Sequence, residues 1–253
     1  MPSTPLSHPL PQTIKALLQP DIHSPKLILA TIPTPVATPG TFEHLIHVHS
    51  TSPCAGELTW TANLSAYTSL LPTLSPSSVT SKLQIPCYDL SGTVLTAPPN
   101  SPFPPGTEVY TRTSFSRPGN ARAYTIALTS ELARKPNNLS WEEAASVPLS
   151  AFTAWQAFAG VEGGEEGGRV VSVKEDPNKW KPNEGVADDV EGKFFVMEPE
   201  GWQLEETAKL IEKGQVKATI DSVWPLRDFE KAFAIVEGGH ARGKVIINVR
   251  DSE

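Results

Sequence analysis

The side chains best able to do chemistry in this chain of 253 residues are its two cysteines, a tyrosine–aspartate pair and a run of histidines. Cys54 and Cys87 cannot supply a four-cysteine zinc lobe or a disulfide framework, so we expect both to pack in the interior. Tyr88 and Asp89 directly follow Cys87. A tyrosine hydroxyl can donate to a carbonyl oxygen and stabilise negative charge that develops there. The alternative is a structural tyrosine with its hydroxyl at the surface.

The histidines fall in the segment EHLIHVHS, residues 43–50. Side chains of a strand alternate between its two faces, so His47 and His49 share one face and His44 lies on the other. Binding of one metal ion by all three therefore fails by geometry. We expect a partly exposed strand instead.

A phosphate-binding loop is absent from the sequence. None of the 17 glycines belongs to a G-x-G-x-x-G fingerprint, and Gly163, Gly164, Gly167 and Gly168 have the wrong spacing for one. A strand predicted at 168–173 runs into Lys-Glu-Asp-Pro, and two carboxylates with a proline cannot present N–H donors to a pyrophosphate. The 73 residues of 161–233 leave room for about two βαβ units of roughly 30 residues each.

The elements that would position these residues are β-rich in the first half of the chain and α/β in the second. Apolar and β-branched runs predict strands at 13–18, 26–30, 43–50, 86–95, 107–113, 123–128, 168–173, 193–197, 218–223 and 244–249. Gly92 interrupts one of these runs and marks a bulge or a point of close packing.

Four helices are expected. Ser140 and Glu143 form a capping box that begins a helix at Trp141. A second helix begins near Pro148 and ends at Gly160. The remaining two lie at 204–213, before a glycine, and at 226–237, where apolar residues repeat at intervals of three and four up to another glycine.

Composition narrows the class of protein further. The net charge is −7, and all of it comes from residues 121–253, which hold 16 Lys/Arg and 23 Asp/Glu. An acidic surface repels nucleic-acid phosphates, so we expect no nucleic-acid partner. No apolar run approaches the ~18–20 residues needed to span a bilayer, and the start of the chain lacks a secretory pattern. We expect a cytoplasmic protein in a reducing environment without a membrane partner.

Five segments carry a family resemblance: HSTSPCAGE (49–57), PCYDLSGT (86–93), PGTEVY (105–110), the connector 138–158 and the stretch 216–249. Together they resemble the medium-chain dehydrogenase/reductase superfamily, on its quinone-reductase and enoyl-reductase side. The resemblance implies a mixed α/β and β protein with a GroES-like β-barrel catalytic domain at 1–160. A truncated Rossmann-like remnant would follow at 161–237, and a C-terminal strand at 238–253 would return to the barrel.

The resemblance also assigns roles to single residues. Tyr88 and Asp89 lie where relatives build the floor of the substrate pocket, and Trp60 could wall an apolar pocket or simply pack. Cys54 and Glu57 lie where zinc-dependent relatives carry a ligand and its acidic neighbour. Tyr88 replaces a histidine ligand, so Cys54 and Asp89 leave an incomplete set and we expect no catalytic zinc.

Two further residues match positions that contact the cofactor. Thr153 corresponds to a threonine near the nicotinamide, although its hydroxyl could equally bond back to its own helix. Lys244, with Arg242 close by, lies where relatives hold the cofactor phosphates; the alternative for both is a solvated turn.

Members of this kind transfer a hydride from NADPH to a quinone or an enone, and the resemblance allows a homodimer. Because the dinucleotide fingerprint is absent, we expect the reaction to be impaired in this chain. A second hypothesis is a cofactor-free ligand-binding protein or isomerase that uses the retained substrate site. A third is a gene product from which an internal segment near 162–168 was lost.

Overall fold

The computed structural model describes residues 9–64, 75–159, 169–173, 175–181, 185 and 190–250. The strands are β1 Thr13–Leu18, β2 Ile28–Pro33, β3 Glu43–Ser52, β4 Asp89–Thr96, β5 Glu108–Arg112, β6 Tyr124–Leu128, β7 Ala133–Arg134, β8 Arg169–Ser172, β9 Glu191–Phe194, β10 Ile220–Pro225 and β11 Lys244–Asn248. The α-helices are α1 Pro76–Ser81, α2 Trp141–Ala145, α3 Pro148–Ala159, α4 Gly201–Glu212 and α5 Phe229–Glu237. Short 3-10 turns lie at Glu57–Thr59 (η1), Pro177–Trp180 (η3) and Leu226–Asp228 (η4).

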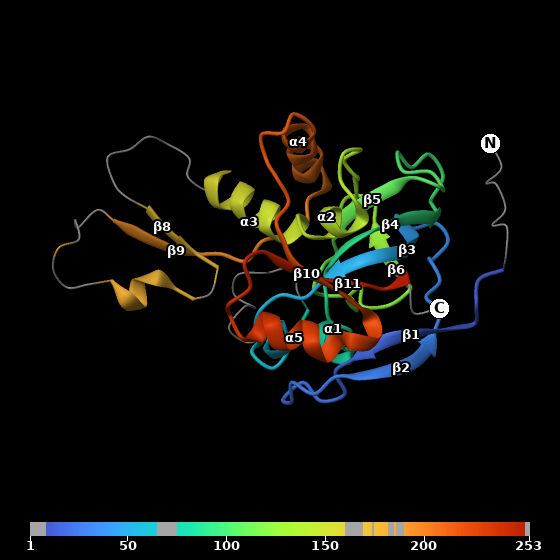
Figure 1. Cartoon of the computed structure of the whole chain (residues 1–253), viewed down its shortest axis with the longest axis horizontal. Coiled ribbons are helices and arrows are strands. Elements are labelled where there is room, and N and C mark those ends of the chain that lie inside the picture. The colour runs from blue at the N-terminus through green and yellow to red at the C-terminus, as the bar shows by residue number, and fades with distance from the viewer. Residues whose placement is uncertain are drawn as a thin grey trace.

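A seven-stranded sheet forms the body of the protein (Figure 1). Its order is β10-β11-β3-β4-β5-β7, and β6 pairs with β3 off this path. The sheet joins the two ends of the sequence, because Ile247 of β11 lies opposite Thr51 of β3 in an antiparallel pair. β10 lies parallel to β11. β1 and β2 form a separate antiparallel pair that touches the body through an Ala16–Arg122 bridge.

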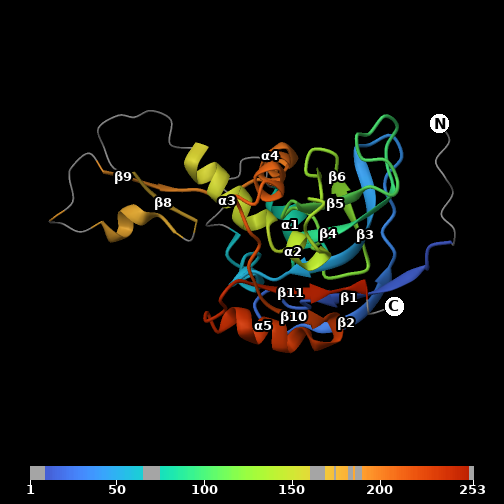
Figure 2. The same ribbon diagram turned by 45° about the horizontal axis from the view of Figure 1, so that its top comes forward.

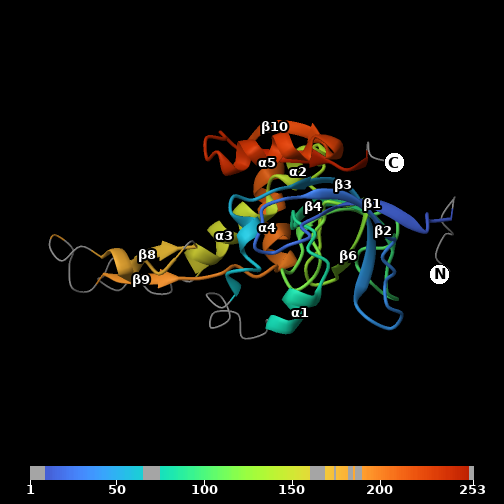
Figure 3. The same cartoon turned by 90° about the horizontal axis from the view of Figure 1, so that it is seen from below.

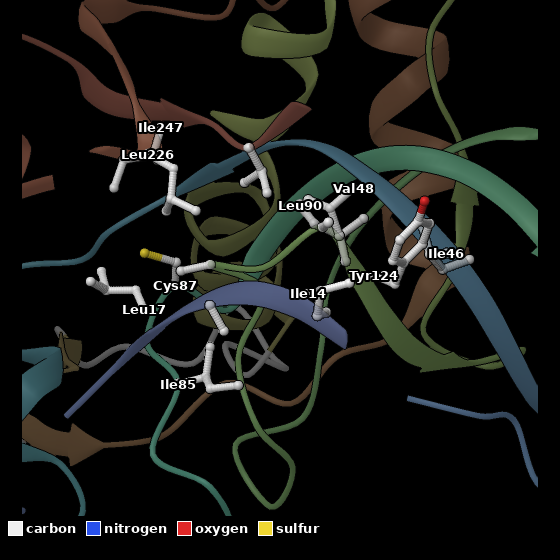
Figure 4. Packing of buried hydrophobic residues seen from close by; sticks show 14 of the residues in the cluster. Ile14, Leu17, Ile46, Val48, Ile85, Cys87, Leu90, Tyr124, Leu226 and Ile247 are labelled. Carbon is white, nitrogen blue, oxygen red and sulfur yellow. The ribbon is translucent and has the colours of Figure 1, made fainter. Parts of the chain in front are cut away.

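The main core lies between these strands and α5, which runs alongside β10 and β11 (Figure 2). The repeat predicted at 226–237 is confirmed, since Leu226, Phe229, Phe233 and Val236 are all buried. Its first turn is the 3-10 segment η4 rather than α-helix. Cys87 is fully buried among Leu17, Ile85 and Leu226 and other core residues (Figure 4). Its expected packing role is confirmed.

Gly92 is a point of close packing, as expected. A Cβ at this position would lie 2.3 Å from the His47 carbonyl oxygen. The β3–β4 register shifts at the same place, between Val48 and Ser50. Only glycine lets the two strands approach this closely.

The connector helices begin as the sequence predicts. The Ser140 hydroxyl accepts from the Glu143 N–H, and the Glu143 carboxylate accepts from the Ser140 N–H. α2 and α3 follow, and the Gly160 end predicted for α3 falls outside the described residues. A second core cluster forms here around Tyr110, Phe152 and Leu204, where α3 and α4 pack against the edge of the sheet.

β8 and β9 form a two-stranded parallel pair that projects from the body beyond α3 (Figures 1 and 3). They are the described strands nearest to the predicted runs 168–173 and 193–197. η3 follows β8, and the glycine cluster at 163–168 lies outside the described residues. β10 and α5 also belong to the predicted 161–237 segment, yet they pack on β11 and the main sheet. The domain boundaries at 160 and 237 stay predictions.

Several sequence predictions need correction. The strand expected at 26–30 lies at Ile28–Pro33, and the one expected from residue 86 begins only at Asp89. The histidine strand is mostly buried rather than partly exposed: Phe103 and Ser101 pack on His44 and Trp141 stacks on His49, while His47 is half-buried. Among the helices of the described segments, none is long and apolar enough to cross a membrane.

Candidate active site

Tyr88 is held by a lysine that sequence reasoning missed. The Lys82 ammonium, just past α1, donates to the Tyr88 hydroxyl at 2.7 Å, to the Phe115 carbonyl at 2.6 Å and to the Arg117 carbonyl at 3.1 Å. These three bonds use all of its protons. Tyr88 is only 6% exposed, so the alternative of a surface hydroxyl is wrong.

Burial changes the acidity of both partners. It raises the pKa of the Tyr88 hydroxyl, which therefore stays protonated at neutral pH. Burial, and secondarily the charge of Arg112, lowers the pKa of Lys82 to about 7. The Tyr88 oxygen accepts from Lys82, while its own O–H proton meets no acceptor among the described residues. Tyr88 is thus a free hydrogen-bond donor.

Aromatic rings surround this pair. The Trp60 ring stacks on Tyr88 with centroids 6.0 Å apart, and Phe115 meets Tyr88 edge-on at 5.4 Å. Trp60 and Phe115 contact each other at 5.7 Å. Lys82 Nζ lies 4.2 Å from the Phe115 ring centroid, a cation–π distance. The rings of Tyr88, Trp60 and Phe115 thus form an apolar cluster, and the Lys82 ammonium group and the Tyr88 hydroxyl are the polar groups within it.

The backbone that aims Tyr88 is unusual. Cys87 has φ 66°, a left-handed conformation that is costly for a residue with a Cβ. Its N–H donates to the Glu57 carboxylate at 3.1 Å, and its carbonyl accepts from the Asn120 N–H. The Asn120 amide in turn donates to the Tyr88 carbonyl. This turn is the reason that β4 begins at Asp89 rather than at residue 86.

Glu57 is a buried carboxyl group beneath this turn. Burial raises its pKa to about 8, against the opposing effect of the Cys87 N–H and the charge of Lys244. Glu57 is therefore mostly protonated at neutral pH. Cys54 lies near the same groups, and burial followed by the charge of Glu57 raises its thiol pKa to about 11. Cys54 is thus a neutral thiol rather than a reactive thiolate.

Asp89 joins three elements. Its Oδ1 accepts from the Leu149 N–H at 3.0 Å, in the first turn of α3, and its Oδ2 forms a 3.3 Å ion pair with Lys244 Nζ on β11. Burial raises the pKa of Asp89. For Lys244 burial lowers the pKa, but electrostatic interactions with Asp89, Cys54 and Glu57 and the hydrogen bond to Asp89 together raise it above its ordinary value. The Asp89 side chain is 2% exposed and that of Lys244 is 19% exposed. Lys244 is not in a solvated turn.

Arg112 is the second cation that sequence reasoning missed. It lies on β5 directly opposite Asp89 and is only 5% exposed. The centre of its guanidinium is 5.6 Å from the Tyr88 ring centroid and 5.9 Å from that of Trp60. The guanidinium forms no hydrogen bond or ion pair with any other described residue. The register of β4 against β5 would have revealed it, but that register requires the fold.

The structure thus brings together most of the residues named from sequence. Tyr88 and Trp60 share the aromatic group, and Cys54, Asp89 and Lys244 interact beside it. Thr153 and Arg242 form no side-chain hydrogen bond or ion pair with that group. Thr153 is half-buried on α3, and its hydroxyl bonds to no other described residue, including its own helix. Arg242 is exposed.

A metal centre is not evident. Within the described part of the chain, no three His, Cys, Asp or Glu side chains are arranged to hold a metal ion. His49 stacks on Trp141 with centroids 3.9 Å apart and contacts the Thr93 hydroxyl at 3.0 Å. His44 contacts Ser101 at 2.7 Å on the opposite face of β3.

A dinucleotide does not fit the described residues. Phosphate cradles of this superfamily need a strand that leads into the free N–H groups of a helix. β8 instead leads into η3, a single 3-10 turn whose Asn178 N–H is already bound by the Asp176 carboxylate. This turn therefore offers no free helix N-terminus to a pyrophosphate. The parallel strands available on this side are the single β8–β9 pair.

Comparison with known proteins identifies the class. A family model described as zinc-binding dehydrogenase matches residues 142–247. A probable zinc-binding oxidoreductase, mitochondrial, from Arthroderma benhamiae is 32% identical over 95% of this chain and 98% of its own length. A trans-enoyl reductase from Penicillium oxalicum is 33% identical over 58 residues, 23% of this chain and 15% of that protein.

Solved structures share the fold. The quinone oxidoreductase from Coxiella burnetii superposes with a TM-score of 0.69 at 18% identity, over 94% of this chain and 100% of that chain. The 2-octenoyl-CoA carboxylase reductase CinF from Streptomyces gives a TM-score of 0.69 at 18% identity, over 98% and 89%. These matches confirm the predicted fold class, a mixed α/β protein shortened relative to its neighbours.

Fold and relatives together define an oxidoreductase-type protein that resembles quinone and enoyl reductases. The chain belongs to the zinc-binding dehydrogenase family of the medium-chain dehydrogenase/reductase superfamily, whose members are NAD(P)-dependent oxidoreductases. The alignment to the Arthroderma protein spans 338 positions, 85 more than the 253 residues of this chain, while covering nearly all of both proteins. The missing positions are therefore internal.

Proposed function

We propose that this chain binds a quinone or an enone at Tyr88 and that its reductase turnover is impaired because it lacks a dinucleotide cradle. The single observation that carries the proposal is the free O–H proton of Tyr88, which stays on the oxygen at neutral pH and lies inside an aromatic site. A ligand carbonyl oxygen is the acceptor that this proton lacks.

Lys82, Trp60 and Phe115 have different roles in the proposed binding. Lys82 holds the Tyr88 oxygen as an acceptor, which turns the tyrosine proton outward to a ligand. Trp60 and Phe115 supply faces and edges on which a planar conjugated ligand can stack. A bound carbonyl would gain partial negative charge on oxygen, which is the polarisation that precedes reduction in this superfamily.

The residues expected to bind the nucleotide support the other part of the proposal, the impaired reductase turnover. We propose that NADPH binds this chain poorly and that zinc takes no part. Lys244 is already paired with Asp89, and the described residues around α3, which carries Thr153, form no phosphate cradle. Tyr88 stands where zinc-dependent relatives have a histidine, so Cys54 and Asp89 remain an incomplete ligand set.

A cofactor-free ligand-binding protein or isomerase is the second candidate. The same free donor favours it, because binding at Tyr88 needs no nucleotide. The two candidates differ in one respect: an impaired reductase still oxidises NADPH slowly when the acceptor is present, whereas a binding protein does not.

The test is calorimetric titration of the purified chain with chromone, a planar enone, and with a naphthoquinone. We expect saturable binding, weakened about tenfold by Tyr88→Phe because one hydrogen bond of roughly 1 kcal/mol or more is lost. Tyr110→Phe is the matched control: its hydroxyl donates to the Leu204 carbonyl at 2.7 Å in the second core cluster. Equal affinities for wild type and Tyr88→Phe would refute the proposed role.

Location and assembly complete the proposal. We propose a cytoplasmic protein that assembles as a homodimer and acts on small molecules. Imaging of the tagged full chain tests the first point, and residence in mitochondria, the compartment in the Arthroderma relative's name, would contradict it.

A further inference from the structure

The charge around Tyr88 is not balanced. Asp89 is paired with Lys244, and Glu131 is paired with Arg117. Glu57 is mostly protonated at neutral pH, since burial raises its pKa to about 8. Asp89 is a described carboxylate whose charge acts on Arg112, but its ion pair is with Lys244, so no described carboxylate forms an ion pair with Arg112.

Arg112 is nevertheless almost completely buried, at 5% exposed. A guanidinium has five N–H donors, and burying a charge without a partner is costly. The rings of Tyr88 and Trp60 compensate only in part, because a cation–π contact satisfies no N–H group. Asp89 lies directly opposite in the β4–β5 register, but its ion pair goes to Lys244. The guanidinium remains available to an anion.

Two unused donors thus lie close together. The Tyr88 hydroxyl and the Arg112 guanidinium belong to the same aromatic group, and the guanidinium centre is 5.6 Å from the tyrosine ring centroid. A carbonyl oxygen suits the first donor, and a planar carboxylate suits the second through two parallel hydrogen bonds.

We infer that the ligand of this site is an α,β-unsaturated carbonyl compound that carries a carboxylate, and that Arg112 binds the carboxylate while Tyr88 binds the carbonyl. This inference rests on the proposed function and adds the charge of the substrate. A preference for an anionic ligand distinguishes this site from one that binds neutral quinones. The preference would be local, because the net charge of the whole protein, −7, repels anions.

The test compares chromone-2-carboxylate with its methyl ester by calorimetry, on wild type and Arg112→Met. The ligands share one ring system and differ in charge. Wild type is expected to bind the carboxylate at least tenfold more tightly than the ester. Arg112→Met should abolish that preference by weakening carboxylate binding at least tenfold more than ester binding. Arg134→Met is the matched control, because Arg134 also lies near an aromatic ring, at 5.7 Å from Phe103, but on β7.

Each outcome decides the inference. Equal binding of the two ligands by wild type overturns it and leaves the proposed function standing, whereas binding of neither overturns both. If Arg112→Met lowers affinity for NADPH instead, Arg112 binds a cofactor phosphate and the inference is wrong. If circular dichroism shows that Arg112→Met does not fold, Arg112→Lys replaces it, because lysine keeps the charge but cannot form two parallel hydrogen bonds to a carboxylate. The ratio of the wild-type affinities for the two ligands remains decisive in either case.

Discussion

At the scale of single residues, buried groups with shifted pKa values define this site. Tyr88 keeps its proton, Lys82 loses part of its charge near neutral pH, and Glu57 gains a proton. In each case loss of solvation is the largest cause. Sequence reasoning found Tyr88 because tyrosine chemistry is visible in the residue type. It missed Lys82 because that lysine reaches Tyr88 only through the path of the chain after α1.

Lys82 should make ligand binding depend on pH. Below pH 7 it is an ammonium group that only donates, so the Tyr88 proton is free for a ligand. Above pH 7 the neutral amine has a lone pair that can accept this proton in competition with the ligand. We expect chromone affinity to fall several-fold from pH 5.5 to pH 8.5 and to lose this dependence in Lys82→Met. Calorimetry at three pH values measures it, and a flat wild-type profile would contradict it.

Glu57 should make stability depend on pH in the opposite way to an ordinary paired carboxylate. Its folded pKa is raised from 4.5 to about 8, so the folded state holds a proton that the unfolded state releases. The favourable contribution is complete below pH 4.5 and is lost as pH rises to about 8. Urea unfolding at pH 5 and pH 7 should show a loss on the order of 2 kcal/mol, which Glu57→Gln removes. Lys82 begins to lose its charge near pH 7, at the upper end of this window, so the comparison stops at pH 7.

At the scale of elements, Asp89 fixes the site by tying together β4, the first turn of α3 and β11. Most elements were predictable from sequence, since capping boxes, helical repeats and apolar runs are local signals. The β4 boundary was not. Its strand starts three residues late because the left-handed turn at Cys87 is set by Glu57 and Asn120, which lie far away in sequence.

Asp89→Asn separates these two ties. Asparagine still accepts from the Leu149 N–H but leaves Lys244 without its partner, so we expect a loss of about 2 kcal/mol in unfolding free energy. Adding Lys244→Met should recover part of this loss, because the unpaired charge is gone. Asp228→Asn is the control: its exposed pair with Lys231 should contribute at most about 0.5 kcal/mol. Urea denaturation of the four variants measures the coupling, and strict additivity of the Asp89 and Lys244 effects would contradict it.

At the scale of the whole molecule, the seven-stranded sheet and its core form the body of the protein, and the segment between α3 and α4 is short relative to the family. The sequence predicted this reduction from two simple facts, the absent glycine fingerprint and the small number of residues between the connector and the C-terminal helix. It could not show that β10 and α5 lie with the body, because that placement depends on pairing between β11 and β3.

The reduced segment leaves apolar side chains uncovered along α3 and the β8–β9 pair. Phe158 is 79% exposed and Trp180 is 71% exposed, with Val170 and Val173 half-exposed nearby in sequence. Exposed apolar surface of this kind favours association. We expect light scattering after size exclusion to show a homodimer, and Phe158→Ser with Trp180→Ser to shift it to a monomer that still binds chromone. Val36→Ser, an 82% exposed residue near β2, is the control, and a monomeric wild type would contradict the prediction.

The most direct test of the account is titration of the full chain with NADPH, alone and in the presence of bound chromone, followed by tryptophan fluorescence and calorimetry. Among the described residues, β8 leads to a 3-10 turn whose Asn178 N–H is already bound by the Asp176 carboxylate, so this turn offers no free helix N-terminus to a pyrophosphate. We therefore predict no saturable NADPH binding below about 1 mM, an affinity weaker than roughly −4 kcal/mol, while chromone still binds. Saturable micromolar binding of NADPH with steady reduction of an enone would contradict the account.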